Sequence, residues 1–398
     1  MATTSEHIRT WTGPAILSFG FRPFFLLGAA WAALAMALWL AMLTGGLALP
    51  TAFDPVSWHA HEFLFGYLGA IVAGFLLTAV PNWTGRLPIV GWGLGGLVLL
   101  WFLGRLAVAV SGMLSAWGVA AVDLAFPVAL ALAIASEIVA GRNWRNLIVL
   151  GMLLVMIVGN TVFHAEAAAG DYAVGGYGFR IGLAAGVMMV SVIGGRIVPS
   201  FTRNWLVKHD PTRLPTPPMQ RFDKVALIAL LMALSAWIAV PDSVMTGALL
   251  LVAGALHLLR LARWRGVRTT AEPLVMVLHL GYLFVPLGAL VMGTAGVWPQ
   301  IVGMAVAQHV WMAGAIGLMT LAVMTRATLG HTGRALHADV GTVALYAALI
   351  VAVLARLAAG MWPALASELH AVSGIGWIAA FSGFAVIYGA LLLRPKPD

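Results

Sequence analysis

Apolar runs of about twenty residues recur along the whole chain, and they constrain its fold more than any other feature. Only 9% of the residues are charged, against roughly 25% in a soluble domain. A chain of this composition cannot cover a surface that faces water. Strands of a membrane barrel would be about 10 residues long and would alternate between apolar and polar positions, which these runs do not. The sequence therefore predicts an all-α, polytopic integral membrane protein.

The limits of the apolar runs, with Gly and Pro between them, predict about twelve transmembrane helices. The expected spans are 24–43, 56–80, 88–110, 115–139, 146–168, 179–199, 223–240, 244–262, 272–293, 300–325, 338–359 and 370–393.

Lysine and arginine set the expected orientation. If the N-terminus is cytoplasmic, the basic residues collect in the inner segments, and of 22 only Arg105, Arg180 and Arg356 fall elsewhere. We expect one transmembrane domain over 1–398, with both termini cytoplasmic and two six-helix halves joined by a basic cytoplasmic loop near 200–222. Topology and contact with the lipid membrane explain the basic loops, so no nucleic acid is expected as a partner.

Cysteine is absent. Its absence excludes disulfides, iron–sulfur clusters, haem attached through a CxxCH motif, and copper sites that need a thiolate. A metal in this chain must be held by His, Met, Tyr or carboxylate side chains. The first apolar run is long enough to span a membrane, so we expect no cleaved signal peptide.

Two imidazoles and a carboxylate lie at the outer end of the second span, within 58–62. Asp54 is expected to cap this helix. Residues two apart on a helix point roughly 200° away from each other, so His59 and His61 serve two centres, or one binds metal while the other makes a hydrogen bond. Glu62 is placed to orient a ring. The alternative is a pair of interfacial histidines that water and backbone satisfy.

Three further histidines lie within spans. His164 ends the fifth span, at a level comparable to His59 and His61. His279 is expected roughly 10 Å from the inner face and His309 roughly 13 Å from the outer face, both inside a core about 30 Å thick. A neutral ring bonded to a neighbouring helix is the structural alternative for each. The candidate metal ligands are His59, His61, His164 and His309; the candidate cofactor ligands are His59, His61, His279 and His309.

Arginines beside the apolar runs are candidate partners for haem propionates, although anchoring at the inner interface is the stronger interpretation. These arginines are Arg22, Arg196 and Arg326. Arg105 and Arg356 lie toward the outer ends of spans, where we expect contact with Asp123, Glu62 or an anionic cofactor edge.

The segment 324–334 after the tenth span is polar and is expected to be a cytoplasmic turn. His331 lies in it, where a solvated side chain is the first interpretation and a ligand or substrate contact the second. Four residues are candidates to hydrogen-bond to a ligating side chain and so orient it: Glu62, Tyr282, His331 and Arg326. The histidines expected to be structural are His7, His209, His257, His337 and His370.

Several longer segments resemble the NnrS family over most of the chain. They include Ser-Phe-Gly-Phe-Arg-Pro-Phe-Phe-Leu at 18–26, Trp-His-Ala-His-Glu-Phe-Leu-Phe-Gly at 58–66, the segment 73–85, Gly-Gly-Arg-Ile-Val-Pro-Ser-Phe-Thr at 194–202, His-Leu-Gly-Tyr at 279–282, and 314–334. The resemblance implies a haem- and copper-containing protein of the bacterial inner membrane that acts in the nitric oxide response. The chain departs from the family pattern at 310–312, next to His309.

The resemblance implies one or two b-type haems bound non-covalently by imidazole, with copper as a further metal. The first function we expect is an enzyme that reduces nitric oxide, with electrons from quinol or a periplasmic carrier. The second is a non-enzymatic haem protein that senses nitric oxide, transfers electrons or protects metal pools. The third is a proton- or metal-coupled transporter, which is disfavoured because neither paired repeats nor broken helices are clear in the sequence.

Overall fold

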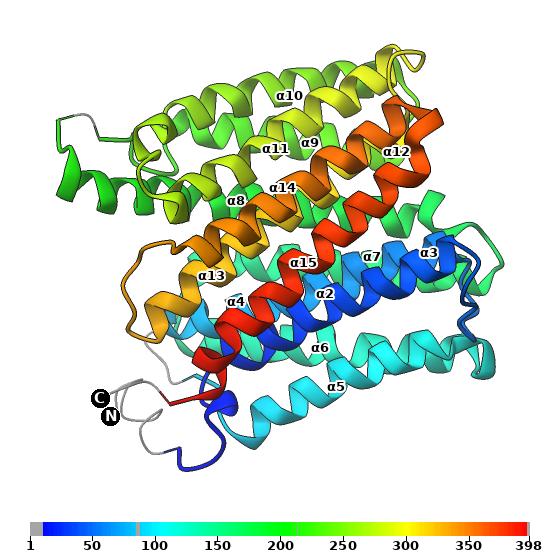
Figure 1. Ribbon diagram of the computed structural model, residues 1–398, viewed down its shortest axis with the longest axis horizontal. Coiled ribbons are helices and arrows are strands. Elements are labelled where there is room, and N and C mark those ends of the chain that lie inside the picture. The colour runs from blue at the N-terminus through cyan, green and yellow to red at the C-terminus, as the bar shows by residue number, and fades with distance from the viewer. Residues whose placement is uncertain (1–10, 85–87, 213, 396–398) are drawn as a thin grey trace. The chain divides into compact units, whose positions relative to one another are not determined.

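The computed structural model describes residues 11–84, 88–212 and 214–395 (Figure 1). This part of the chain contains no strand and is 81% helical. Twelve of the described helices are long and apolar enough to cross a membrane, which confirms the all-α polytopic fold. His7 and Gly85, which belong to the features named above, lie outside the described residues.

The helices that could span a membrane are α2 (Phe21–Leu43), the continuous α3 (Pro55–His61), η2 (Glu62–Tyr67) and α4 (Leu68–Thr84), α5 (Trp92–Ala109), α6 (Ala116–Ala140), α7 (Leu147–Ala168), α8 (Tyr177–His209), α9 (Arg221–Ala239), α10 (Val244–Ala262), α11 (Pro273–Val297), the continuous α12 (Met304–His309), η7 (Val310–Leu318) and α13 (Met319–His331), α14 (Val340–Met361) and α15 (Ala366–Leu393). Short 3-10 turns lie between or before them: η1 (Ala15–Leu17), η3 (Ser111–Met113), η4 (Trp144–Asn146), η5 (Ala173–Gly175), η6 (Gly266–Thr269) and η8 (Pro363–Leu365).

Capping carboxylates set where several helices begin. Asp54 accepts hydrogen bonds from the backbone N–H groups of Val56 and Ser57, at 3.0 and 2.9 Å, which confirms the expected cap of the second span. Asp339 begins α14 in the same way, because the Thr342 N–H donates to it at 2.7 Å. This bond lowers the pKa of the Asp339 carboxyl, since it favours the ionised form.

Two predicted loops are wrong in part, because their first residues are helical. Helix α8 continues to His209, so the connection expected over 200–222 begins only after that residue. Basic residues in the last turn of α8 suit the negative end of the helix dipole. Helix α13 continues to His331, through much of the turn expected at 324–334. Its polar composition does not interrupt the helix, because Thr325 and Thr332 bond their hydroxyls to carbonyls one turn earlier.

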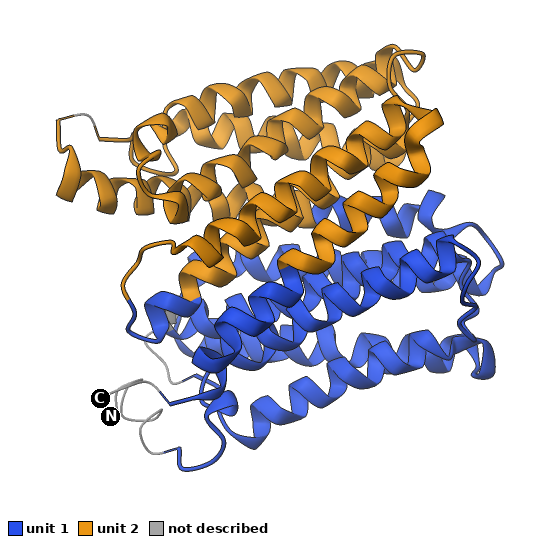
Figure 2. Cartoon of the chain, viewed as in Figure 1, with its two compact units in different colours: residues 1–185, 328–334, 381–398 blue, residues 186–327, 335–380 orange. Residues whose placement is uncertain are grey.

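The chain divides into two compact units (Figure 2). Unit 1 comprises residues 1–185, 328–334 and 381–398, and unit 2 comprises 186–327 and 335–380. In unit 1, α2 packs on α4, α5 on α6, and α6 on α7; in unit 2, α10 packs on α9 and α11, and α11 packs on η7. The division of a single domain into two six-helix halves stays a prediction.

Arg22 closes the C-terminal end of α15 within unit 1. Its Nη1 atom donates to the carbonyl oxygens of Leu391, Leu392 and Arg394, at 3.2, 2.9 and 2.6 Å. The last carbonyls of a helix have no partner inside it, and a cation at that end is favourable. Arg22, which the sequence suggested as a partner for a haem propionate, therefore caps the end of α15 instead.

The change Arg22→Gln is expected to lower the free energy of unfolding by about 1.5–3 kcal/mol, the net value of a hydrogen bond from a charged donor. Thermal unfolding of the detergent-purified protein measures this loss. The matched control is Arg203→Gln, because Arg203 is exposed on α8 and should change stability by less than about 0.5 kcal/mol. Equal unfolding temperatures for the two variants would contradict the capping role.

Candidate metal centre

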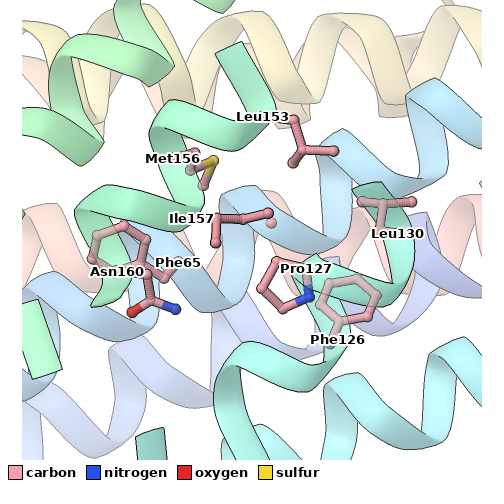
Figure 3. A pocket seen from close by; sticks show the side chains of 9 residues that line it. Phe65, Phe126, Pro127, Leu130, Leu153, Met156, Ile157 and Asn160 are labelled. Atoms are coloured by element: carbon pink, nitrogen blue, oxygen red, sulfur yellow. The ribbon is translucent and has the colours of Figure 1, made fainter. Parts of the chain in front are cut away.

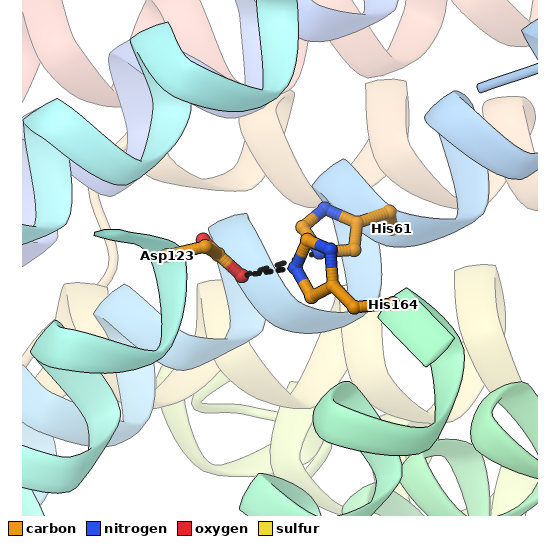
Figure 4. A group of neighbouring side chains, drawn as sticks. All are labelled: His61, Asp123 and His164. Carbon is orange, nitrogen blue, oxygen red and sulfur yellow. Dashed lines mark hydrogen bonds and ion pairs between the residues drawn. The ribbon is translucent and has the colours of Figure 1, made fainter. Parts of the chain in front are cut away.

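Three helices of unit 1 bring His61, Asp123 and His164 together (Figure 4). His61 is the last residue of α3, Asp123 lies in α6 and His164 in α7. One nitrogen or oxygen atom of each side chain lies within 4.8 Å of those of the other two, and all three residues are buried. Among the described residues, this is the one group of three or more His, Cys, Asp or Glu side chains that meets this spacing.

The spacing of the three side chains fits a small cation. His61 Nε2 lies 3.3 Å from Asp123 Oδ2, and His164 Nε2 lies 3.1 Å from the same oxygen. Metal bonds of about 2.1 Å at tetrahedral angles would separate ligand atoms by about 3.4 Å. Small side-chain shifts therefore suffice to arrange the three atoms around an ion. Two imidazoles and one carboxylate suit copper, zinc or ferrous iron.

Asn160 of α7 indicates where the protons of this group lie. Its amino group donates to Asp123 Oδ2 at 2.8 Å, so its carbonyl oxygen faces His61 Nε2 at 3.0 Å. That contact requires a hydrogen on Nε2. His61 Nδ1 in turn faces Glu62 Oε1 at 3.1 Å, where a bare nitrogen would meet a bare carboxylate. A second hydrogen must therefore lie between His61 Nδ1 and Glu62 Oε1. With it, the His61–Glu62 pair is neutral overall, instead of carrying the single negative charge of a neutral imidazole beside an ionised carboxylate.

Arg105 of α5 bridges the two carboxylates. Its Nη1 donates to Glu62 Oε1 at 2.7 Å, and its Nη2 donates to Asp123 Oδ1. The expectation that Arg105 meets Asp123 or Glu62 is confirmed for both. Arg105 and the extra proton on the His61–Glu62 pair balance the two negative charges. A net charge of zero is favourable here, because an uncompensated ion in a buried site costs several kcal/mol.

Glu62 contacts His61 rather than His59, and the contact suits metal binding. If His61 offers Nε2 to a metal, its hydrogen belongs on Nδ1, and Glu62 Oε1 is in place to accept it. Metal-bound histidines in proteins usually donate their other N–H in this way, which orients the ring and makes the ligand more basic. The residues present therefore fit a metal: His61, Asp123 and His164 supply suitable ligand atoms, and Glu62 is placed to orient the His61 ring.

A π-helical segment, η2, begins directly after α3. Such segments are rare and frequently lie at functional sites. Gly66 in this segment leaves room for Arg105, because a Cβ at this position would collide with its Nη1 and lie 2.9 Å from Glu62 Oε2. The Gly66 carbonyl accepts a hydrogen bond from the Trp101 indole at 2.9 Å. The irregular turn thus holds Glu62 and Arg105 beside the metal group.

His59 does not belong to the three-residue group. Its ring stacks on that of Trp39, with centroids 4.5 Å apart and planes at 16°, and lies 4.7 Å from the Phe63 ring. His59 and His61 therefore have separate sets of neighbours, which confirms the two-sided geometry expected from their spacing. A ligand role for His59 stays a prediction.

In unit 2, His279 of α11 has one ring nitrogen without a hydrogen-bond partner among the described residues. The Thr202 hydroxyl donates to the Val198 carbonyl at 2.8 Å, so at 2.7 Å from His279 Nε2 it accepts. A neutral ring then carries its hydrogen on Nε2 and its lone pair on Nδ1. That Nδ1 is buried, and no described residue forms a hydrogen bond with it. Gly266 lies beside it, and a Cβ there would come within 2.5 Å of Nδ1.

Tyr282 belongs to another buried polar group of unit 2. Arg260 donates to the Tyr282 hydroxyl at 2.7 Å and to the Asp223 carboxylate at 2.8 Å. The Tyr282 hydroxyl then donates to His257 Nδ1 at 2.9 Å, and His257 Nε2 donates to the Ala226 carbonyl at 3.0 Å. These hydrogen bonds connect α9, α10 and α11, so Tyr282 and His257 contribute to the packing of these helices.

His309 lies at the end of α12, directly before the second π-helical segment, η7. Its Nδ1 donates to the Ala305 carbonyl at 2.7 Å, which places the lone pair of a neutral ring on Nε2. In this tautomer Nε2 is the nitrogen that could bind a metal ion.

The other candidates have simpler surroundings. In unit 2, the Arg326 guanidinium lies 4.1 Å from the centre of the Phe201 ring, and Arg196 is half-buried on α8. In unit 1, His331 lies 5.3 Å from the Phe21 ring at the end of α13. The structure thus brings together only His61, His164 and Glu62 of the predicted site residues in unit 1.

Asp123 and Asn160 complete the centre, although the sequence did not indicate them as ligand and support. A lone carboxylate inside an apolar run is a signal in itself, because ionisable groups at membrane depth are rare and usually functional. Asn160 precedes His164 by one helical turn, so the two side chains share a face of α7.

The family model described as NnrS protein matches residues 15–396, which is nearly the whole chain. A search of curated proteins finds no match. The matched region includes every residue of the metal group.

Proposed function

We propose that this chain, which belongs to the NnrS family, binds a redox metal at His61, Asp123 and His164 and acts in nitric oxide metabolism. The buried three-residue group with Glu62 behind His61 is the observation that carries this proposal. Copper is the metal we favour, since imidazole and carboxylate suit Cu²⁺ and the family resemblance implies copper. Ferrous iron is the competing occupant, because two histidines and one carboxylate are also its familiar ligand set.

A b-type haem is the second cofactor that we propose. His279 supports it, because its buried Nδ1 lone pair has no hydrogen-bond partner among the described residues. His309 is the second imidazole that we propose would hold haem, because its Nδ1 donates to the Ala305 carbonyl and so fixes the orientation of the ring. The two histidines lie near opposite ends of neighbouring antiparallel segments, so we assign them to different haems. In unit 2 we favour Arg196 as the propionate partner over Arg326, whose guanidinium lies over the Phe201 ring. Arg22 is less suited because it caps α15.

The proposed reaction is the reduction of nitric oxide: two NO, two electrons and two protons give N₂O and water. A bound redox metal would supply electron transfer and a binding position for NO, with electrons from quinol or a periplasmic carrier. The residues of this chain would hold the ligand atoms in a fixed geometry and exclude bulk water, since all of them are buried. Glu62 Oε1 lies 3.1 Å from His61 Nδ1 and would hold the hydrogen on that nitrogen, which leaves Nε2 directed at the metal.

The test is to purify the protein from membranes, measure its metals, record reduced-minus-oxidised spectra, and follow NO consumption with an electron donor. Haem, a bound redox metal and NO turnover together are the expected result. Cofactors without turnover would support a protein that senses NO or transfers electrons. A protein with neither haem nor a redox metal at the three-residue group would overturn the proposal.

The change His279→Ala is expected to remove the haem assigned to His279, so that haem per protein falls, while the haem assigned to His309 and the metal at the three-residue group remain. The reason is that the Nδ1 lone pair is lost and no ligand atom of the metal group changes. Pyridine haemochrome spectra measure haem per protein, and elemental analysis measures the metal. His209→Ala is the matched control, since His209 is exposed and donates only to the Trp205 carbonyl of its own helix in the described contacts. Full haem content in the His279 variant would show that another residue is the ligand.

A further inference from the structure

Unit 1 contains a small cavity, and Figure 3 shows the side chains that line it. One of them is Asn160, which contacts His61 and Asp123 of the metal group. The volume of the cavity is about 20 Å³, which is room for one or two water-sized molecules. The lining comes from the α3–α4 segment, α6 and α7: Phe65, Gly69, Phe126, Pro127, Leu130, Leu153, Met156, Ile157 and Asn160. Asn160 is the one residue of this lining with a polar side chain.

The chemistry of the lining excludes a stably bound water. A buried water usually makes about three hydrogen bonds. Asn160 already uses its carbonyl oxygen for His61 and its amino group for Asp123, so it has at most one further N–H and one lone pair for the cavity. The other lining side chains are apolar. A cavity with so few hydrogen-bonding partners stays dry and suits a small apolar guest.

Asn160 and Phe65 form the wall between the cavity and the metal group. Asn160 contacts His61 and Asp123 directly, and the Phe65 ring lies 5.4 Å from that of His61. A guest in the cavity is therefore separated from two of the three ligand residues by single side chains.

The cavity is partly open where Gly69, Pro127 and Ile157 line it, since these residues are only half-buried. They lie within membrane-spanning helices, far from the helix ends. Entry at this depth favours a solute that is dissolved in the bilayer over one dissolved in water.

We propose that this cavity is a holding site for a small uncharged diatomic gas that enters from the hydrocarbon of the membrane and passes Asn160 to the metal centre. The identity of the gas as nitric oxide rests on the proposed function; the existence of the gas site does not. Size, dryness, depth and contact with the metal group through Asn160 together support it.

Filling the cavity tests this inference. A Cβ at Gly69 meets no heavy atom of the described chain within 4 Å, so Gly69→Ala and Gly69→Val place one and three carbon atoms in open space at the lining. Gly151→Ala and Gly151→Val are the matched controls. Gly151 lies on α7 outside the lining, its Cβ would also meet no described heavy atom within 4 Å, and the helix-propensity change is the same.

The first readout is xenon, located in xenon-pressurised crystals of the purified protein. Xenon is expected in the wild-type cavity and in the Gly151 variants, with graded loss from Gly69→Ala to Gly69→Val. An empty cavity or an ordered water in wild type would overturn the inference, whatever the protein does with nitric oxide.

The second readout is NO binding to the metal-loaded protein, followed by stopped-flow spectroscopy. The Gly69 variants should slow both association and dissociation severalfold with little change in Kd, because a blocked route alters rates and not the bound state. Unchanged rates would overturn the route. Xenon in the cavity of a protein that binds no NO would preserve the gas site and refute the proposed function.

Discussion

Replacing Arg105 by glutamine is expected to destabilise the protein by about 3–5 kcal/mol, the cost of removing one partner from a buried ion pair. The Arg105 side chain is 4% exposed, and it donates to both Glu62 and Asp123. Without it, the two carboxylates face each other with only the proton of the His61–Glu62 pair between them. Thermal unfolding in detergent should show a decrease of several degrees.

A second change should restore part of this loss. Glu62→Gln in the Arg105→Gln background removes one negative charge, so the remaining Asp123 carboxylate is again balanced by a protonated His61. The double variant is expected to be more stable than Arg105→Gln alone, and the double-mutant cycle gives the coupling between Arg105 and Glu62. Additive losses from the two changes would mean that the pair does not act as a charge-balanced unit.

The largest functional effect is expected from His164→Ala. This change removes one of three ligand side chains, and even the loss of a supporting partner behind a ligand costs about 10–100-fold in metal affinity. Competition with a chelator of known affinity measures the change, and elemental analysis measures the metal that remains after purification. Thermal unfolding verifies that the variant is folded.

The matched variant is His59→Ala, which lies two residues from a ligand on the same helix. Because the His59 ring packs against Trp39 and lies outside the three-residue group, metal at that group should be unchanged. Loss of metal from the His59 variant, with retention in the His164 variant, would place the centre on the other face of α3.

The number and type of the helices could be predicted from the sequence, since a membrane span needs about 20 apolar residues in succession and this requirement is local. The chemistry of the centre was also restricted from the start, because a chain without cysteine must use imidazole, thioether, phenol or carboxylate ligands. The spacing of His59 and His61 predicted two separate environments. The position of Arg105 predicted contact with Asp123, Glu62 or an anionic cofactor edge, and the structure shows contact with both carboxylates. Each of these inferences depends on a few neighbouring residues or on composition.

Only the tertiary structure decided which side chains meet. Asp123 and Asn160 reach His61 from α6 and α7, and Arg22 reaches the end of α15 from a position far away in the sequence. The sequence could not predict these pairings, because a span that is apolar around most of its circumference carries little signal for its rotation about its axis. Packing between helices sets that rotation, and with it the choice of His61 over His59 as the partner of His164.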